Sequence, residues 1–299
     1  MKHKWLIATI LIAVELVIGA LIIASVNVPM PDLGTQFRFF QYDTVPAESA
    51  EEQRIPIGGA THLIVSNLRG QIAIASAPGD AIIIHAHKRA WSNTVANAQA
   101  ALAQLDVNIT QTNDTIEITR LTEEPWRPGI ASMLRSPTVA LTITVPATME
   151  VTARLDVGDV MLADTIGNAD LRTNVGAVSV KNVVGDLQLY ASTGNITVTN
   201  ALAGALNART SNGAITFAGS LGTGPHTLES DHGNIRLSLP KDSTFAFDLQ
   251  TDRGTIQSDL PLAFTSDLKS RKRGTLNHGG ARFTINAHNG NIALMLLNP

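Results

Sequence analysis

The sequence contains no cysteine, and this absence excludes several classes of protein at once. A disulfide scaffold, a Cys-ligated zinc, a thiol nucleophile and a lipoprotein anchor all require cysteine. Aromatic residues make up only 4% of the chain, a composition that suits thin, stacked β-structure better than a thick globular core. The formal net charge is −3, so no strong field draws the protein to DNA or to an anionic membrane. The 299 residues suffice for one large or two modest domains.

The N-terminal segment contains one long apolar run, from Trp5 to Val26. At about 1.5 Å per residue, a helix of this length crosses the hydrocarbon core of a bilayer. Two lysines precede the run, so the positive-inside rule predicts a cytoplasmic N-terminus and places residues 30–299 outside the cytoplasm. Residues 1–28 are therefore predicted to be a cytoplasmic tip and a single-pass anchor in a bacterial cell membrane. The alternative is a cleaved signal peptide, which would give a secreted protein.

One acid, Glu15, lies in the middle of the apolar run. A charge at the bilayer centre costs about 2.5–3.5 kcal/mol on insertion scales. Two interpretations follow. Glu15 is an intramembrane contact for a partner or a second copy, or it is an acid that is protonated or reaches the interface.

Two segments separate this run from the repetitive part of the chain. Residues 29–57 are predicted to be a solvated linker, because prolines at four positions interrupt regular structure and three glutamates favour water. Residues 58–154 show alternating apolar residues with glycine and proline turns, which predicts a small β-rich domain. Its Ala-rich segment VANAQAALAQL predicts one short helix, with Ser92 or Asn93 as its cap.

A glycine recurs through residues 155–299 at spacings of 18, 18, 19, 20 and 21 residues, and once more after an interruption. We expect the glycines to occupy structural turns that need positive φ. They are Gly158, Gly176, Gly194, Gly213, Gly233, Gly254 and Gly290. The residue two positions after each is Val or Ile: Val160, Val178, Ile196, Ile215, Ile235, Ile256 and Ile292. Gly70 begins the same pattern in the preceding segment.

A second set of glycines divides each repeat in half. Gly167, Gly185 and Gly204 are followed by apolar residues at two and four positions, so each half-repeat predicts a short strand with two inward side chains. The sequence therefore predicts a mainly β fold, a β-solenoid with two short strands per 18–21-residue coil, whose coils bury their apolar residues only by stacking. Residues 261–280 are predicted to be a loop that interrupts the stack.

At this point the chain resembles the bacterial putative-adhesin family of β-strand-repeat proteins, a domain of unknown function. The resemblance rests on the x-G-[NDA]-[IV]-x-[VLF] units, the stretch LPKDSTFAFDLQTDRGTIQSDLP and the final NGNIAL, and it covers about residues 58–299. It implies a solenoid architecture. It implies no catalytic residues, and "adhesin" in that family is largely an inferred label.

Outward positions on one face of the predicted solenoid form two neighbouring ladders. The candidate ligand face consists of Asp170, Gln188 and Asn207 in one ladder and Arg172, Tyr190 and Arg209 in the other. Polar, cationic and aromatic side chains in this arrangement can hydrogen-bond and stack against a sugar polymer. The alternative is an ordinary solvated sheet face.

Other candidate sites are weaker. Outward acids such as Asp159 and Asp186 do not share a column, so the clustered carboxylates of a polysaccharide-cleaving β-helix are missing. His85 and His87 lie two apart on one strand face but lack a third ligand, and the four histidines at 226, 232, 278 and 288 share no ligand spacing. The basic run Lys269, Arg271, Lys272 and Arg273 suits a solvated loop or an anionic polymer or lipid. No nucleic-acid motif accompanies it.

These observations predict a non-enzymatic interaction protein without metal or cofactor, anchored to the membrane through Trp5 to Val26 and displayed outside the cell. Its expected partner is a cell-wall glycan or a protein. Two alternatives remain: an envelope-stress or signalling accessory that acts through a membrane partner, and a polysaccharide-acting β-helix enzyme. Open solenoid ends tend to pair, so end-to-end self-association is also predicted.

Overall fold

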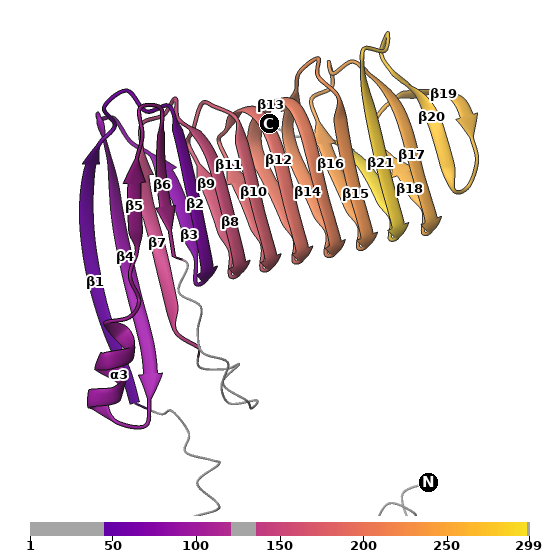
Figure 1. The fold of residues 1–299 in the computed structure, drawn as a ribbon. Helices are drawn as coiled ribbons and strands as arrows, with labels where there is room; N and C mark the ends of the chain where they lie inside the picture. The colour runs from indigo at the N-terminus through magenta and orange to yellow at the C-terminus, as the bar shows by residue number, and fades with distance from the viewer. Residues whose placement is uncertain (1–44, 121–135, 298–299) are drawn as a thin grey trace, which may run out of the picture. The chain divides into compact units, whose positions relative to one another are not determined.

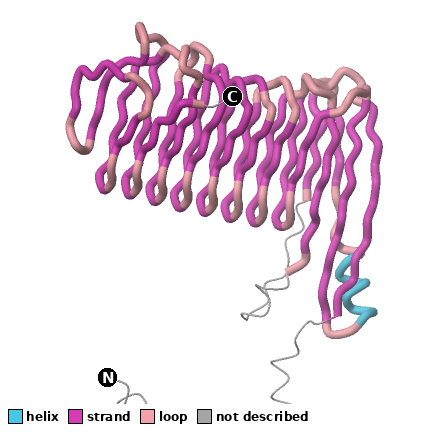
Figure 2. Tube along the Cα trace, turned by 180° about the vertical axis from the view of Figure 1, so that it is seen from behind, coloured by secondary structure: helices cyan, strands magenta, loops and turns pink. Residues whose placement is uncertain are grey.

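The structure, a computed structural model, describes residues 45–120 and 136–297, and these belong to one compact unit. They form two sheets whose strands stack side by side into a solenoid (Figure 1). Each coil contributes one strand to each sheet, and the turns between the sheets line up in a row (Figure 2). The mainly β, repetitive fold with one short helix is therefore confirmed.

The first sheet is parallel through most of its length, and antiparallel hairpins close both of its ends. Its strands, in spatial order, are β5 (Asn108–Gln111), β6 (Thr115–Thr119), β2 (His62–Arg69), β8 (Glu150–Val157), β10 (Ala169–Val175), β12 (Val184–Thr193), the end of β13 (Ile196–Asn212), β15 (His226–His232), β21 (Ala281–Asn289), β17 (Phe245–Arg253), β20 (Arg271–Leu276) and β19 (Leu262–Asp267).

The second sheet lies on the other side of the same core. Its strands, in spatial order, are β1 (Val45–Pro56), β4 (Ala81–Ser92), β7 (Thr138–Val145), β3 (Ile72–Ser76), β9 (Val160–Ala163), β11 (Val178–Lys181), the beginning of β13, β14 (Ile215–Leu221), β16 (Ile235–Leu239), β22 (Ile292–Leu296) and β18 (Ile256–Ser258). The Val and Ile column that follows the repeat glycines is buried throughout and joins the inward leucines of the first sheet in one core.

The repeat glycines lie directly on top of one another. A Cβ atom added at Gly176 would collide with the carbonyl of Gly158, and the same holds for each of the seven repeat glycines with the glycine of its neighbouring coil. The predicted positive φ is present at Gly158, Gly176, Gly194 and Gly233, but Gly213, Gly254 and Gly290 lie outside that region. Close approach between coils, rather than φ alone, therefore explains why glycine recurs at all seven positions.

Polar groups complete this contact. Hydroxyl groups buried three residues before some repeat glycines donate to the carbonyl of a neighbouring glycine at 2.8–2.9 Å; they belong to Thr173, Thr210, Ser230 and Thr251. Beside the glycines, the side chain of Asn195 accepts from the backbone N–H of Ala214 at 2.8 Å. At these positions hydroxyl and amide hydrogen bonds therefore join neighbouring coils in addition to the backbone hydrogen bonds.

The order of coils in space departs from the order of the sequence at both ends. β2 and β3, which come early in the chain, lie between β6/β7 and β8/β9. β21 and β22, the last strands, lie between β15/β16 and β17/β18. The first and last coils of the sequence are thus inserted into the stack and paired on both sides.

The N-terminal region differs from its prediction in two ways. Residues 45–56 are not linker but form β1, which pairs antiparallel with β4 along its whole length. As an edge strand, β1 tolerates Pro46 and Pro56 at its ends, since no neighbour needs their missing N–H groups. The structure also shows no boundary near residue 155, because β8 runs across it and β2 and β3 already belong to the solenoid.

The helix and the interruption also differ in detail from what was predicted. Helix α3 (Val95–Leu102) is capped by Thr94, which accepts from the N–H of Asn97 at 3.2 Å, and not by Ser92 or Asn93. Most of residues 261–280 form the hairpin β19–β20, which covers the outer edge of β17, instead of a loop.

The predicted membrane anchor from Trp5 to Val26, with Glu15, lies outside the described residues, as does most of the predicted linker. In the part of the chain that the structure describes, no helix combines the length and the apolar character needed to cross a bilayer.

The glycine contact predicts the outcome of one substitution. Gly194→Ala places a Cβ against the carbonyl of Gly176, and overpacking of this kind lowers the free energy of unfolding by about 1–3 kcal/mol. Gly79→Ala is the matched control, because Gly79 has a nearly equal φ of +155° but open space around its Cβ position. Urea unfolding of both variants separates steric collision from backbone strain. Equal losses of stability would contradict the stacking contact.

Candidate ligand face and histidine cluster

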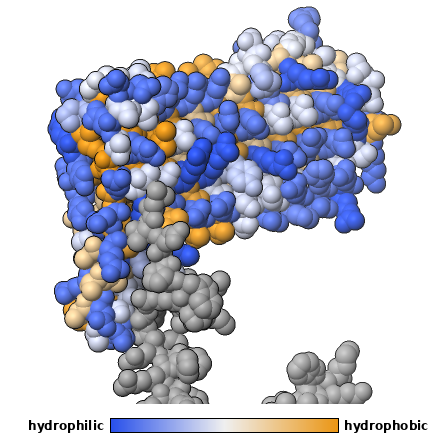
Figure 3. Space-filling view, viewed as in Figure 1, coloured by the Kyte–Doolittle hydropathy of each residue, from blue (hydrophilic) through white to orange (hydrophobic). Residues whose placement is uncertain are grey.

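The six residues of the predicted ligand face come together on the outer face of the first sheet. Asp170, Gln188 and Asn207 are register partners on β10, β12 and β13. Arg172, Tyr190 and Arg209 form the next row on the same strands. Neighbouring strands lie about 4.7–4.9 Å apart, so both rows are continuous. Hydrophilic side chains cover most of the visible surface on the side shown in Figure 3.

Ion pairs within the face hold its two arginines. Arg172 donates two hydrogen bonds to Asp170, at 2.7 and 2.9 Å, and this hydrogen bonding raises the pKa of Arg172. Arg209 lies 3.4 Å from Glu229 on β15. Tyr190, which is half-buried, stands between the two arginines in its row. The row of Arg172, Tyr190 and Arg209 therefore presents three planar groups, and nearby carboxylates partly neutralise the charges of its two arginines.

A hollow of about 340 Å³ opens at the start of these strands. Asp170 and Gln188 line it together with the outward acid Asp186 and with three residues that the sequence did not suggest: His62, Asp114 and Glu150. His62 Nε2 lies 2.9 Å from Glu150. His62 and Asp114 reach this place because β2 and β6 stack beside β8. The hollow extends the predicted face toward the N-terminal coils.

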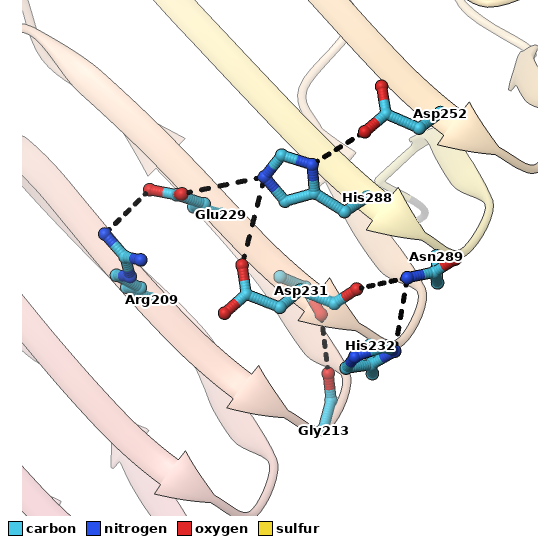
Figure 4. Close-up of polar contacts among 9 residues, drawn as sticks. Arg209, Gly213, Glu229, Asp231, His232, Asp252, His288 and Asn289 are labelled. Carbon is cyan, nitrogen blue, oxygen red and sulfur yellow. Dashed lines mark hydrogen bonds and ion pairs between the residues drawn. The ribbon is translucent and has the colours of Figure 1, made fainter.

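A histidine cluster lies at the other end of the same face (Figure 4). His288 on β21 stands between β15 and β17. Its Nδ1 is 2.8 Å from Asp252 Oδ2, and its Nε2 is 3.9 Å from Asp231 Oδ1 and 4.0 Å from Glu229 Oε1. The ion pair of Arg209 with Glu229 connects this cluster to the predicted face.

The carboxylates around His288 shift its titration. The hydrogen bond to Asp252, supported by the charges of Asp252, Asp231 and Glu229, raises the pKa of His288. The same hydrogen bond lowers the pKa of Asp252. The sequence showed only that this histidine shares no ligand spacing with the others. It could not show the carboxylates around His288, because Asp231 and Asp252 meet this residue only through the inserted coil.

His226, His85 and His87 lie away from this cluster. His226 is buried between the rings of Phe245 and Phe283, and its Nε2 is 3.0 Å from the Gly222 carbonyl. His85 and His87 each face a single glutamate on β1, at 3.6 Å, rather than a shared point.

The basic run is largely ion-paired within the β19–β20 hairpin region. Arg271 and Arg273 share Asp248, at 2.8 and 3.2 Å, and Lys272 lies 2.6 Å from Asp267. The hydrogen bond from Arg271 is the largest of the effects that lower the pKa of Asp248. Lys269 is exposed. The run therefore serves to attach the hairpin to β17.

Comparison with known proteins places the chain in a family. The family model described as Toastrack DUF4097 matches residues 70–220 and 168–295. The chain belongs to the Toastrack DUF4097 family. The expected resemblance to a putative-adhesin family of unknown function is thereby confirmed. No curated protein matches the chain.

The chain is also similar to solved structures of low sequence identity. A putative cell adhesion protein from Clostridium sporogenes has 12% identity and a TM-score of 0.40, over 84% of this chain and 100% of that one. A putative adhesin from Bacteroides fragilis has 11% identity and a TM-score of 0.32, over 83% and 97% of the two chains.

The histidine cluster predicts a pH dependence of stability. Because the folded-state pKa of His288 is raised, its ion pairs stabilise the fold fully below the unfolded value of about 6.5, and this contribution is lost as pH rises through the folded-state pKa. His226 acts in the opposite window: burial lowers its pKa, so its protonation in the unfolded chain costs stability as pH falls below about 6.5.

Urea unfolding between pH 6.5 and 9 measures the His288 contribution separately. We expect the wild type to lose more stability over this range than His288→Gln, while His278→Gln, which changes an exposed histidine outside the cluster, behaves as the wild type. Identical pH profiles for wild type and His288→Gln would contradict the assigned ion pairs.

Proposed function

We propose that this protein is a non-enzymatic interaction protein of the bacterial cell envelope that binds an extended glycan along the outer face of its first sheet. The observation that carries the proposal is the in-register row of Arg172, Tyr190 and Arg209 on consecutive strands. A tyrosine ring and guanidinium planes present flat surfaces to sugar rings. The parallel row of Asp170, Gln188 and Asn207 supplies acceptors and donors for hydroxyl groups.

Two further features support the proposal. Charged and amide groups are among those that line the hollow beside Asp170 and Gln188, and one end of a polymer could bind in it. The ion pairs of Arg172 and Arg209 hold the planar groups in fixed positions before a ligand arrives, and such preorganisation lowers the entropic cost of binding.

The location at the envelope is part of the same proposal. The apolar run from Trp5 to Val26 would tether the protein, and the solenoid would carry the ligand face outside the cytoplasm. Cleavage after this run would give the same face in secreted form.

Binding to purified cell-wall polymer tests the ligand face directly. The triple variant Arg172→Ala, Tyr190→Ala and Arg209→Ala should reduce co-sedimentation affinity at least tenfold, because a few central aromatic and arginine contacts carry most of the energy of such surfaces. The matched control Lys181→Ala, Thr199→Ala and Arg236→Ala removes a comparable set from the outer face of the second sheet and should bind as the wild type.

Three results would contradict the proposal. They are a wild type that does not bind, a triple variant that binds normally, and a control that loses binding equally. All six side chains point outward from the sheets, so we expect each variant to keep the fold. Circular dichroism of each variant checks this expectation.

A further inference from the structure

His288 presents one ring nitrogen to two carboxylates without a hydrogen bond to either. Its Nε2 is 3.9 Å from Asp231 Oδ1 and 4.0 Å from Glu229 Oε1, distances beyond those of a hydrogen bond. The three donor atoms nevertheless converge, since all lie within 4.8 Å of one another. A nitrogen and two carboxylate oxygens therefore surround a common point from two adjacent strands.

Asp252 determines which nitrogen of the neutral ring carries the proton. Its Oδ2 lies 2.8 Å from Nδ1, and because an ionised carboxylate only accepts, Nδ1 must be the donor. In the neutral ring the Nε2 lone pair then faces Glu229 and Asp231. Metal-binding histidines usually donate their other ring N–H to a carboxylate in this way, which fixes the orientation of the ring.

We propose that Glu229, Asp231 and His288 bind one Zn²⁺ ion, with Asp252 as a positioning residue. Zinc takes imidazole nitrogen and carboxylate oxygen at about 2.0–2.2 Å. Tetrahedral coordination at that length separates the donor atoms by about 3.3–3.6 Å. Small side-chain rotations would bring the three donor atoms, which now lie within 4.8 Å of one another, to this separation. The half-exposed ring leaves the fourth position to water.

The metal would have a structural effect as well. Glu229 and Asp231 belong to β15, while His288 belongs to β21 in the inserted last coil. An ion bound by all three joins the C-terminal coil to its neighbour, and a ligand that binds only the folded protein stabilises it. Zinc should therefore raise the unfolding temperature. Neutral histidine is required, so protons compete with the metal and affinity should fall as pH falls.

Calorimetric titration of the full-length, untagged protein with ZnCl₂ in metal-free buffer tests the site. We expect one ion per chain at pH 7.5, no binding at this site in His288→Gln or Asp231→Asn, and affinity reduced about 10- to 100-fold in Asp252→Asn. His232→Gln is the matched control: His232 is the adjacent exposed histidine in Figure 4, contacting Asn289 and not the carboxylates, and this variant should bind as the wild type.

Thermal unfolding with and without ZnCl₂ provides a second measurement on the same variants. A zinc-dependent rise in the wild type and His232→Gln, absent in His288→Gln, supports the site. Absence of binding in the wild type would overturn it. Binding that survives in His288→Gln, or is lost in His232→Gln, would overturn the assignment to Glu229, Asp231 and His288.

Discussion

Adjacent coils of the solenoid approach one another through a column of glycines, and the rest of the fold depends on this contact. The carbonyl of each glycine occupies the space where a side chain on the next one would lie. Coils can therefore pack at strand-pairing distance through the turn as well as through the sheets. Because the turns remain in register, the Val and Ile column two residues later is buried in coil after coil, and each such residue contributes about 1.5–3 kcal/mol.

Insertion of the terminal coils answers the main weakness of a linear stack. A coil at the end of a solenoid pairs on one side only, so it frays and offers an open edge. Here the first and last coils in sequence are each paired on both sides. The outermost positions are taken by hairpins and by strands with blunted edges: β18 has three residues, and β1 carries prolines and glutamates. End-to-end association stays a prediction.

The repeat could be predicted from the sequence because its contacts are local and periodic. Gly194 and Ile196 repeat the environment of Gly176 and Val178, so spacing alone indicates both turn and core, and the ligand rows follow from the same register. Periodicity does not state which coil lies next to which once the chain is interrupted. The neighbours of His288 are therefore invisible in the sequence, although the residue types of a metal site are all present.

Other misses have equally specific causes. The prolines at 46 and 56 suggested a linker, but proline is compatible with the ends of an edge strand. The polar segment 261–280 suggested a loop, but Arg271 and Arg273 attach it to Asp248 on β17 as a hairpin. In both places tertiary pairing, rather than local propensity, decides the structure.

The same inserted coil builds the histidine cluster and is paired on both sides, so the coil order is the point to test. The chain has no cysteine, which makes engineered disulfides unambiguous. Arg236 and Gln257 both pair with Ala293, one on each side. Paired residues on neighbouring strands lie about 4.7–4.9 Å apart, which allows a disulfide. Residues that are separated by an intervening strand lie about twice as far apart, which does not. We expect the double variants Arg236→Cys/Ala293→Cys and Ala293→Cys/Gln257→Cys to form a disulfide. The double variant Arg236→Cys/Gln257→Cys should remain reduced. A disulfide in this last variant would show that the coils stack in sequence order and would contradict the insertion.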